Sequence, residues 1–470
     1  MMTKRFFILL AMFVTIQCWG QSSEESYKLG KQYYHARNYS KAVESLTKAA
    51  QQGHNDAQNY LGVCYEKGQG VEQDNSKAIY WYTKAAEQGN IIAQCNLGKR
   101  YLVMEDFAKA VYWFTKAAEK GHNEAQNNLG LCYHEGNGVK QDHTKAVYWY
   151  TKAAQQGYSM AQGNLGICYY LGEGVAQDYS QAVYWFERAA QQGYSHSQSN
   201  LGVCYEEGQG VEKNASKAVF WYTKAAKQGY AEGQCNLAKS YYWGRGIEQD
   251  YAKAAYWFEK AAQQGYSEAQ SNLGVCYEKG QGVEKDVLKA VYWYTKAAKQ
   301  GHATGQCNLA NRYYWGRGIE QDYAKAAYWY GKAAEQGDCQ AQYYLGGCYE
   351  KGQGVKQDTE QAIHWYKKAA EQGVHPAQYQ LGVLLYNAKN SEALTYLRKA
   401  AANPNIDVNA KSDAMHKISV CYRYGRCGAR QDDAQAEYWT KEAAKHGNAD
   451  AQKIQEWLDQ MRTSELSTSN

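Results

Sequence analysis

The sequence predicts an all-α protein, an α/α superhelical solenoid of about 12 helical hairpins. Tryptophan recurs every 36 residues through the middle of the chain, and each interval holds two segments with apolar residues at helical spacing. Glycine is abundant, at 44 residues, whereas proline occurs only 2 times, so the turns must depend on glycine. The regular tryptophans are Trp149, Trp185, Trp221, Trp257, Trp293, Trp329 and Trp365.

Residues 1–20 are expected to be a secretory signal peptide, cleaved after Gly20, which predicts a secreted or periplasmic protein. The basic start "MMTKR" precedes the apolar run "FFILLAMFVTI", and "QCWG" ends on a small residue. The run of 11 apolar residues is too short to span a bilayer, and no later stretch suggests a transmembrane segment. Gln17 stands where a lipidation motif needs a small residue, so a lipid anchor at Cys18 is not expected.

The first helix of one unit begins near Ser159. Apolar residues follow at intervals of four around Leu165, and Ser159 with Gln162 fits a capping box. Gly172 and Gly174 are expected to end this helix, because its C-terminus favours positive φ. The same pattern predicts capping boxes for Asn123 with Gln126 and for Ser267 with Gln270.

The second helix of the unit is expected to follow Asp178, which is placed as an N-cap. Ala182, Trp185, Phe186 and Ala189 then form a core stripe. One hairpin cannot bury both of its apolar faces, but stacked hairpins can. The predicted caps are Asp74, Asp142, Asp178, Asp250, Asp286, Asp322 and Asp358.

The segment "AQNYLGVCYEKGQGVEQDNSKAIYWYTKAAEQGN", residues 57–90, resembles a Sel1-like repeat. The pattern recurs with few changes to residue 373. The resemblance implies a tetratricopeptide-like scaffold that holds partner proteins together, and generally no enzymatic activity. The expected parts of the chain are the signal peptide 1–20, a tetratricopeptide-like repeat 21–56, the Sel1-like array 57–373, divergent repeats with a capping helix 374–462, and a polar tail 463–470.

Composition and spacing argue against several other functions. A formal charge of +5 is small for 470 residues, so no nucleic-acid partner is expected. The 11 histidines show no metal-ligand spacing, so no catalytic site, metal or cofactor is predicted. The G-x-G turns follow helices and lack the third glycine of a dinucleotide-binding loop, which favours a structural turn.

The cysteines leave two interpretations open. Three "L-G-x-C-Y" cysteines are each followed, 31 residues later, by a "Q-C-N-L" cysteine, which suggests disulfides between repeats in a secreted chain. The two positions differ by about 7.5 Å along a helix, whereas a disulfide needs Cα atoms within roughly 7 Å, so buried free thiols are the alternative. Cysteine-rich relatives of the Sel1-like type pair a cysteine of the first helix with the cysteine of a "K-A-C" segment in the second helix. This chain always has alanine at that place, so their disulfide pattern does not carry over. The candidate pairs are Cys64 with Cys95, Cys204 with Cys235, and Cys276 with Cys307.

The candidate partner-binding residues lie in the stretch "YYWGRG", which occurs twice in two closely similar 72-residue blocks. Other repeats hold Lys67, Glu135, Leu171 or Lys279 at the tryptophan position. A tryptophan beside an arginine near a helix end suits an interface anchor, although it could also only cover the next turn. The candidates are Tyr242, Trp243, Arg245, Tyr314, Trp315 and Arg317.

The sequence therefore predicts a non-enzymatic scaffold in the cell envelope or outside the cell, which binds a protein or peptide along its concave face. The alternative is a cell-envelope hydrolase, a β-lactamase-like activity suggested for cysteine-rich relatives. That alternative needs an off-pattern cluster of catalytic residues, and the least regular region offers only His416, Cys421 and Cys427. A lumenal adaptor is a third role in the family, but "STSN" is no retention signal.

Overall fold

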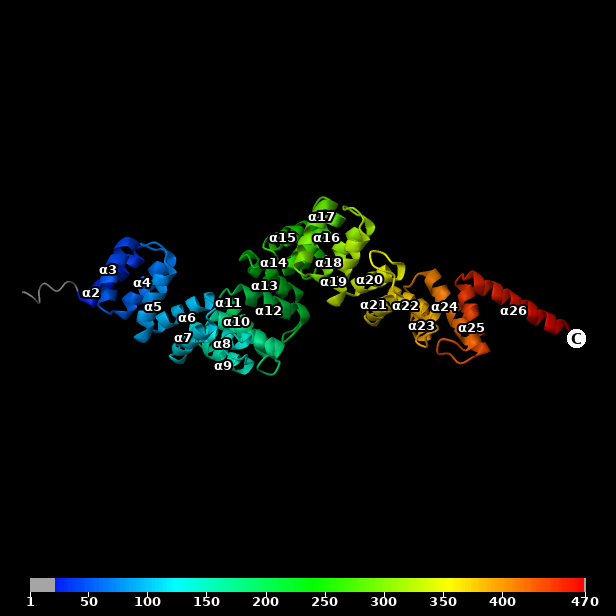
Figure 1. The fold of residues 1–470 in the computed structure, drawn as a ribbon, viewed down its shortest axis with the longest axis horizontal. Coiled ribbons are helices and arrows are strands. Elements are labelled where there is room, and N and C mark those ends of the chain that lie inside the picture. Colours follow the sequence, from blue (N-terminus) through cyan, green and yellow to red (C-terminus); the bar gives the residue numbers. More distant parts are fainter. Residues whose placement is uncertain (1–21, 469–470) are drawn as a thin grey trace, which may run out of the picture. The chain divides into compact units, whose positions relative to one another are not determined.

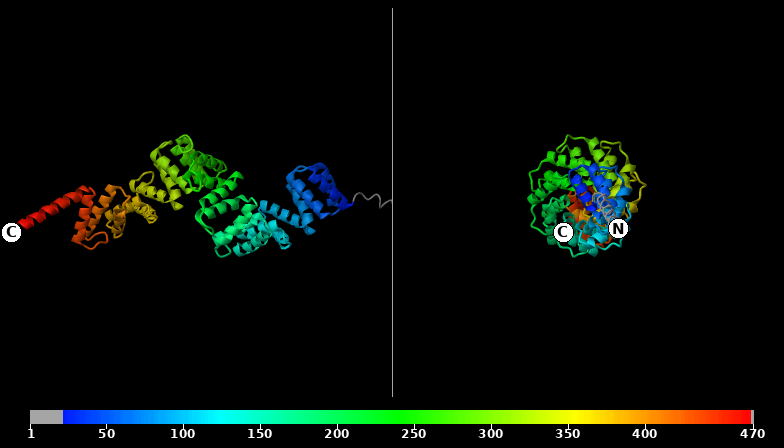
Figure 2. Two further views of the ribbon diagram at one scale, coloured as in Figure 1. Left: turned by 180° about the vertical axis from the view of Figure 1, so that it is seen from behind. Right: turned by 90° about the vertical axis from the view of Figure 1, so that its left-hand side faces the viewer.

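The computed structural model describes residues 22–468, with side chains to Met461, so the predicted signal peptide lies outside the described residues. This part of the chain forms twelve consecutive helical hairpins and one terminal helix (Figures 1 and 2). Among the described residues, no helix has the length and apolar character needed to cross a membrane. The predicted all-α repeat architecture is confirmed.

The hairpins pair each odd-numbered helix with the helix before it. The first helices are α2 (Ser23–His35), α4 (Asn55–Lys67), α6 (Ile91–Val103), α8 (Asn123–Glu135), α10 (Ser159–Leu171), α12 (Ser195–Glu207), α14 (Ala231–Trp243), α16 (Ser267–Lys279), α18 (Ala303–Trp315), α20 (Cys339–Lys351), α22 (His375–Asn387) and α24 (Val408–Tyr424). The second helices are α3 (Tyr39–Gln51), α5 (Asn75–Glu87), α7 (Phe107–Glu119), α9 (His143–Gln155), α11 (Tyr179–Gln191), α13 (Ala215–Lys227), α15 (Tyr251–Gln263), α17 (Val287–Lys299), α19 (Tyr323–Glu335), α21 (Thr359–Glu371), α23 (Ala393–Ala402) and α25 (Asp433–Lys445). The terminal helix is α26 (Ala449–Thr468).

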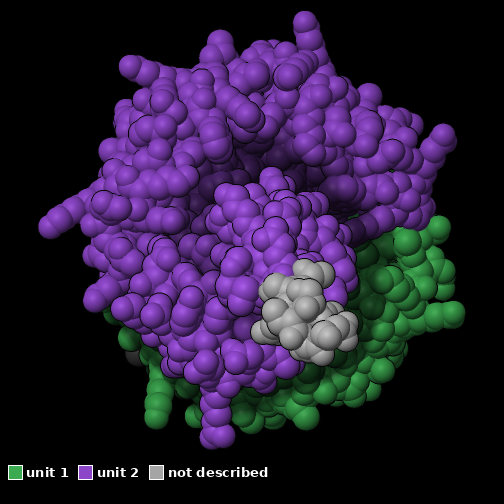
Figure 3. All heavy atoms as spheres, turned by 90° about the vertical axis from the view of Figure 1, so that its right-hand side faces the viewer, with its two compact units in different colours: residues 1–233 green, residues 234–470 purple. Residues whose placement is uncertain are grey.

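The chain is divided into two compact units, with the boundary between Gly233 and Gln234 (Figure 3). The division falls inside α14, and the repeat pattern continues through it without a linker. Helices α2–α13 belong to the first unit and α15–α26 to the second. Within each unit, a hairpin packs on the one that follows it, so the core is a series of similar clusters.

The predicted N-caps of the second helices are confirmed. Asp178 accepts hydrogen bonds from the backbone N–H groups of Ser180 and Gln181, at 2.9 and 3.0 Å. The other six aspartates each accept from the N–H group three residues ahead. Gly172 ends α10 with a φ of 79°, as predicted for the C-terminus of a first helix. These acidic residues thus have a structural role.

The predicted capping boxes are wrong, because their glutamines make a different contact. Tyr158 is the N-cap of α10, without a side-chain cap. Gln162 instead donates from Nε2 to the carbonyl oxygen of Ala154 in α9, at 3.1 Å, and accepts from Gln192, the C-cap residue of α11, at 2.7 Å. The caps predicted at Asn123 and Ser267 are likewise replaced by His122 and Tyr266. These buried glutamines therefore tie each hairpin to the preceding one.

The nine hairpins from α4–α5 to α20–α21 each close around one buried aromatic ring from the second helix, whereas Leu46 and Leu397 take its place in α3 and α23. Phe186 is 1% exposed, and a Cβ atom on Gly166 of the first helix would lie only 2.6 Å from its ring. In several hairpins the ring is a tyrosine, such as Tyr294, whose hydroxyl donates to Glu278 at 2.7 Å. Burial raises the pKa of Tyr294. Trp185, predicted as core, is partly buried and packs on the cluster of the preceding hairpin.

The G-x-G turns hold neighbouring hairpins together, which confirms the structural interpretation of this motif. The first glycine ends the first helix with a left-handed conformation. The second glycine faces the start of the second helix in the preceding hairpin: a Cβ atom on Gly174 would lie 2.3 Å from the carbonyl oxygen of His143. A side chain at this position would therefore separate the two hairpins.

The last hairpins are less regular than the array. Val374 precedes α22 as its N-cap, and Asp407 caps α24, which is 17 residues long. The loop between α23 and α24 is short, because α23 ends at Ala402 and α24 begins at Val408. The terminal helix continues to Thr468, into the expected polar tail 463–470, since no glycine or proline interrupts this stretch.

Candidate functional site

Trp243 and Trp315 end two first helices and expose 60% and 52% of their surfaces. Each indole packs edge-on against the preceding tyrosine, with ring centroids 4.8 Å apart. The guanidinium group of Arg317 lies 6.0 Å from the Trp315 ring, a weak cation–π contact. Arg245 and Arg317 are both exposed in the G-x-G turns. The structure thus places the predicted tryptophans and arginines on the surface.

The predicted tyrosines have mainly structural partners. The hydroxyl of Tyr242 donates to Oε1 of Gln281 at 2.5 Å, and the hydroxyl of Tyr314 donates to Gln353 at 2.6 Å. Both glutamines belong to the turn of the next hairpin. Tyr242 is only 7% exposed. The two tyrosines therefore support the tryptophans and leave them as the exposed part of the motif.

A pocket of about 250 Å³ opens beside Trp243, between α14 and α16. A second pocket, of about 290 Å³, lies between α10 and α12 beside Leu171, which occupies the repeat position of Trp243. The pocket beside Trp243 is lined by Lys239, Tyr242, Trp243, Phe258, Glu268, Asn272, Val275 and Lys279. The one beside Leu171 is lined by Ile167, Tyr170, Leu171, Phe186, Asn200, Val203 and Glu232. Six lining positions of the two pockets coincide after a shift of 72 residues, so the same pocket occurs twice, two hairpins apart along the chain.

The second helices present another row of half-exposed rings, which the sequence interpretation missed. These rings directly precede the repeated tryptophans, and a lysine or arginine four residues later lies over each of them, as Lys260 does over Tyr256 at 5.6 Å. The rings are Tyr80, Tyr112, Tyr148, Tyr184 and Phe220 in the first unit, and Tyr256, Tyr292 and Tyr328 in the second. These cationic partners cover part of the face of each ring.

The predicted disulfides are not formed in this structure, in which all twelve cysteines of the described residues are free thiols. Cys64 lies in a core cluster with Ala42 and Leu46 of the preceding hairpin. Cys95 lies in another cluster, with Phe114 and residues of the following hairpin. The two thiols therefore point to opposite sides of the stack. Cys204 and Cys307 face the preceding and the following hairpin in the same way.

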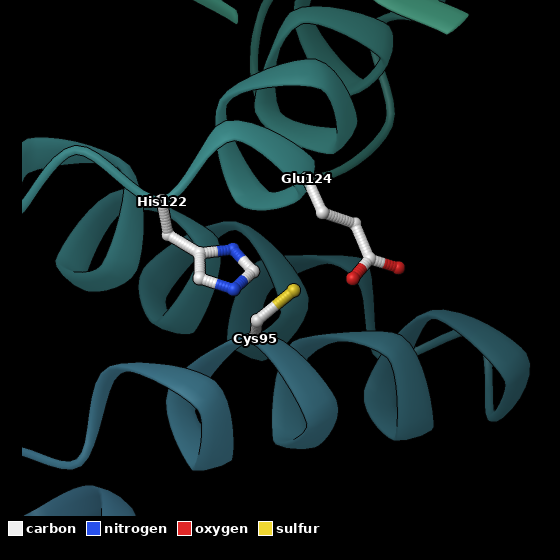
Figure 4. A group of neighbouring side chains, drawn as sticks. All are labelled: Cys95, His122 and Glu124. Carbon is white, nitrogen blue, oxygen red and sulfur yellow. The ribbon is translucent and has the colours of Figure 1, made fainter. Parts of the chain in front are cut away.

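One group of ligating side chains forms around Cys95, His122 and Glu124 (Figure 4). Nδ1 of His122 accepts from the backbone N–H of Ala125 at 3.2 Å, which places the ring proton on Nε2 and keeps that atom from binding a cation. Glu124 is already paired with Lys99 at 3.0 Å. Burial, with a smaller effect of Glu124, raises the pKa of Cys95 to about 12. This group is a packed junction with a neutral thiol.

A second group brings together His134, His143 and Glu173, with ligand atoms within 4.8 Å of one another. Spacing along the sequence did not reveal it, because Glu173 comes from the turn of the next repeat. The detectable signal is a comparison of repeat positions. In four other hairpin junctions, the same three positions hold two tyrosines and a glutamine.

Comparison with known proteins gives a consistent family match. The model of the family described as Sel1 repeat matches residues 25–54, 55–90, 91–122, 123–158, 159–194, 195–230, 231–266, 267–302, 303–338, 339–374, 375–405 and 412–448. Among solved structures, c5321, a protective antigen present in uropathogenic Escherichia coli strains, is 38% identical, with a TM-score of 0.65 over 90% of this chain and 93% of its own. A Sel1 repeat protein from Oxalobacter formigenes is 32% identical over 73% of this chain and 89% of its own, with a TM-score of 0.48. No curated protein matches.

Proposed function

The chain belongs to the Sel1 repeat family, and on that basis we propose that it is a non-enzymatic scaffold that binds a protein or peptide along its concave face. We take this face to be lined by the first helices and call it the groove. The supporting observation is the pocket beside Trp243, in which a large exposed ring borders a hollow lined by apolar and polar side chains. Exposed aromatic side chains that become buried on binding supply much of the free energy in many protein interfaces.

The pocket has the chemistry expected for a peptide site. Phe258 and Val275 belong to its apolar lining, and Lys239, Glu268 and Lys279 add charges of both signs. Lys239 and Glu268 already pair with each other at 3.1 Å, which fixes this part of the lining. A mixed apolar and polar pocket suits a protein surface, where an apolar side chain enters and backbone groups meet the rim.

The proposed location is the cell envelope or the exterior of the cell. It rests on the sequence of residues 1–20 and on the likeness to c5321, which is described as a protective antigen. The proposed absence of enzymatic activity rests on the structural use of the titratable residues. Repeated aspartates cap helices, and repeated glutamates such as Glu278 accept from buried tyrosines.

The double variant Trp243→Ala with Trp315→Ala is expected to lose partners without losing its fold. Removing a tryptophan anchor costs roughly 2 kcal/mol or more, so capture of a partner should fall by about 30-fold. The measurement is crosslinking of the wild type and the variant in the native host, followed by quantitative mass spectrometry. Circular dichroism should show an unchanged helical spectrum.

The matched control is Tyr256→Ala with Tyr328→Ala, which removes two rings of similar exposure from second helices of the same unit. This control should retain the partners of the wild type. An unchanged partner set in the tryptophan variant would contradict the proposed site. Equal losses in both double variants would point to a surface other than the groove of the first helices.

A further inference from the structure

The imidazole rings of His134 and His143 meet at one hairpin junction of the first unit. Their Nδ1 atoms are 3.3 Å apart, and the ring planes are inclined by 74°. Oε2 of Glu173, in the following turn, lies 3.7 Å from Nε2 of His134. His134 and Glu173 retain 30% and 38% of their side-chain exposure, so solvent and small ions can reach the group.

The same junction is built differently elsewhere in the chain. Tyr170 packs edge-on against Tyr179, with centroids 5.3 Å apart, and donates its hydroxyl proton to Gln209 of the next turn at 2.6 Å. Equivalent sets are Tyr34, Tyr39 and Gln69; Tyr242, Tyr251 and Gln281; and Tyr314, Tyr323 and Gln353. All three positions thus change together, from two tyrosines and a glutamine to two histidines and a glutamate. Two tyrosines and a glutamine are enough to pack such a junction, so packing alone does not explain two histidines and a glutamate there.

We propose that His134, His143 and Glu173 bind a first-row divalent cation of the Zn²⁺ type. Two imidazole nitrogens bound to Zn²⁺ at about 2.0–2.1 Å in a tetrahedron lie about 3.3–3.4 Å apart, which matches the observed Nδ1 separation. Glu173, whose Oε2 lies beside Nε2 of His134, turns its carboxylate towards the two Nδ1 atoms to supply the third ligand, and water supplies the fourth. Imidazole and carboxylate together suit Zn²⁺ and its neighbours in the first row.

A cation at this place would join two hairpins. His134 lies in the last turn of α8, His143 begins α9, and Glu173 lies between α10 and α11. The second glycine of that turn, Gly174, already packs on the backbone of His143. The metal would therefore stabilise an existing contact between repeats, independently of any protein partner.

The test compares Zn²⁺ binding to the tag-free full chain and to the triple variant His134→Tyr, His143→Tyr, Glu173→Gln. The variant copies the set that the chain itself uses at four other junctions, so it should fold. Isothermal titration calorimetry should show one Zn²⁺ per wild-type chain, with an affinity that falls by about 100-fold in the variant because its side chains are poor Zn²⁺ ligands. Zn²⁺ should also raise the unfolding temperature of the wild type but not of the variant.

Substitution by Co²⁺ identifies the ligands. The proposed site should give visible ligand-field bands without a thiolate charge-transfer band, whereas a site at Cys95 would show that band. The single variant Glu173→Gln should weaken binding by about 10-fold, since one of three protein ligands is lost. Equal Zn²⁺ affinity of the wild type and the triple variant, or a thiolate band that persists in the triple variant, would overturn the proposal.

Discussion

Gly282→Ala is expected to open the junction between α15 and the α16–α17 hairpin, at a cost of about 3 kcal/mol or more in local stability. The added Cβ atom would lie 1.8 Å from the carbonyl oxygen of Tyr251, which is backbone and cannot move aside. The residue also has a φ of 75°, where alanine is disfavoured by roughly 1–2 kcal/mol. Overpacking against the neighbouring hairpin adds about 1–3 kcal/mol.

Gly301→Ala separates these two costs. Gly301 ends the α17 segment with a φ of 85°, but a Cβ atom there meets nothing within 4 Å. The control should therefore lose only the backbone contribution, roughly 1–2 kcal/mol. Hydrogen exchange in peptides from α15 and α16 measures the local opening of the junction in both variants, and urea unfolding measures their free energies of unfolding. Equal destabilisation would show that the second glycine of the turn has no packing role.

Gly274→Ala is expected to destabilise the α16–α17 hairpin by about 2 kcal/mol, although alanine is the better helix former. Gly274 faces the fully buried ring of Tyr294, and a Cβ atom would lie 2.5 Å from Cε1 of that ring. The ring cannot withdraw without breaking its hydrogen bond to Glu278, because the hydroxyl donates to that carboxylate at 2.7 Å.

Gly331→Ala in α19 should have the opposite sign. A Cβ atom at Gly331 meets nothing within 4 Å, so the variant should gain roughly 0.5–1 kcal/mol from the lower backbone entropy of its unfolded state. Thermal and urea unfolding monitored by circular dichroism compare the two variants. If Gly274→Ala were also stabilising, the prediction would be wrong, because the close contact between α16 and the Tyr294 ring would not require a glycine.

The repeat itself was predictable because every feature that defines it is local. Asp178 as a cap and Gly172 as a helix end follow from the conformations that these residues prefer. Gln162 shows where local reasoning fails. A serine followed three residues later by glutamine fits a capping box, but this glutamine bonds to Ala154, eight residues earlier in another helix. Only the stacking of hairpins makes that partner available.

The candidate sites were predictable only in part. Trp243 and Trp315 were identified because they depart from the repeat, and the structure exposes both. Tyr242 was assigned to the same site, but its hydroxyl is used by Gln281 of the next hairpin. The group of His134, His143 and Glu173 joins two repeats, so no motif of fixed spacing along one segment could reveal it.

Photo-crosslinking from the first helices tests the scaffold account most directly. A photoreactive phenylalanine analogue at position 243 or 315 replaces an exposed tryptophan of the groove, and the same analogue at position 256 or 328 samples the rings on the second helices. After irradiation in the native host, the account predicts discrete protein adducts from positions 243 and 315, and few from 256 and 328. Adducts only from 256 and 328, or none from any of the four positions, would contradict it.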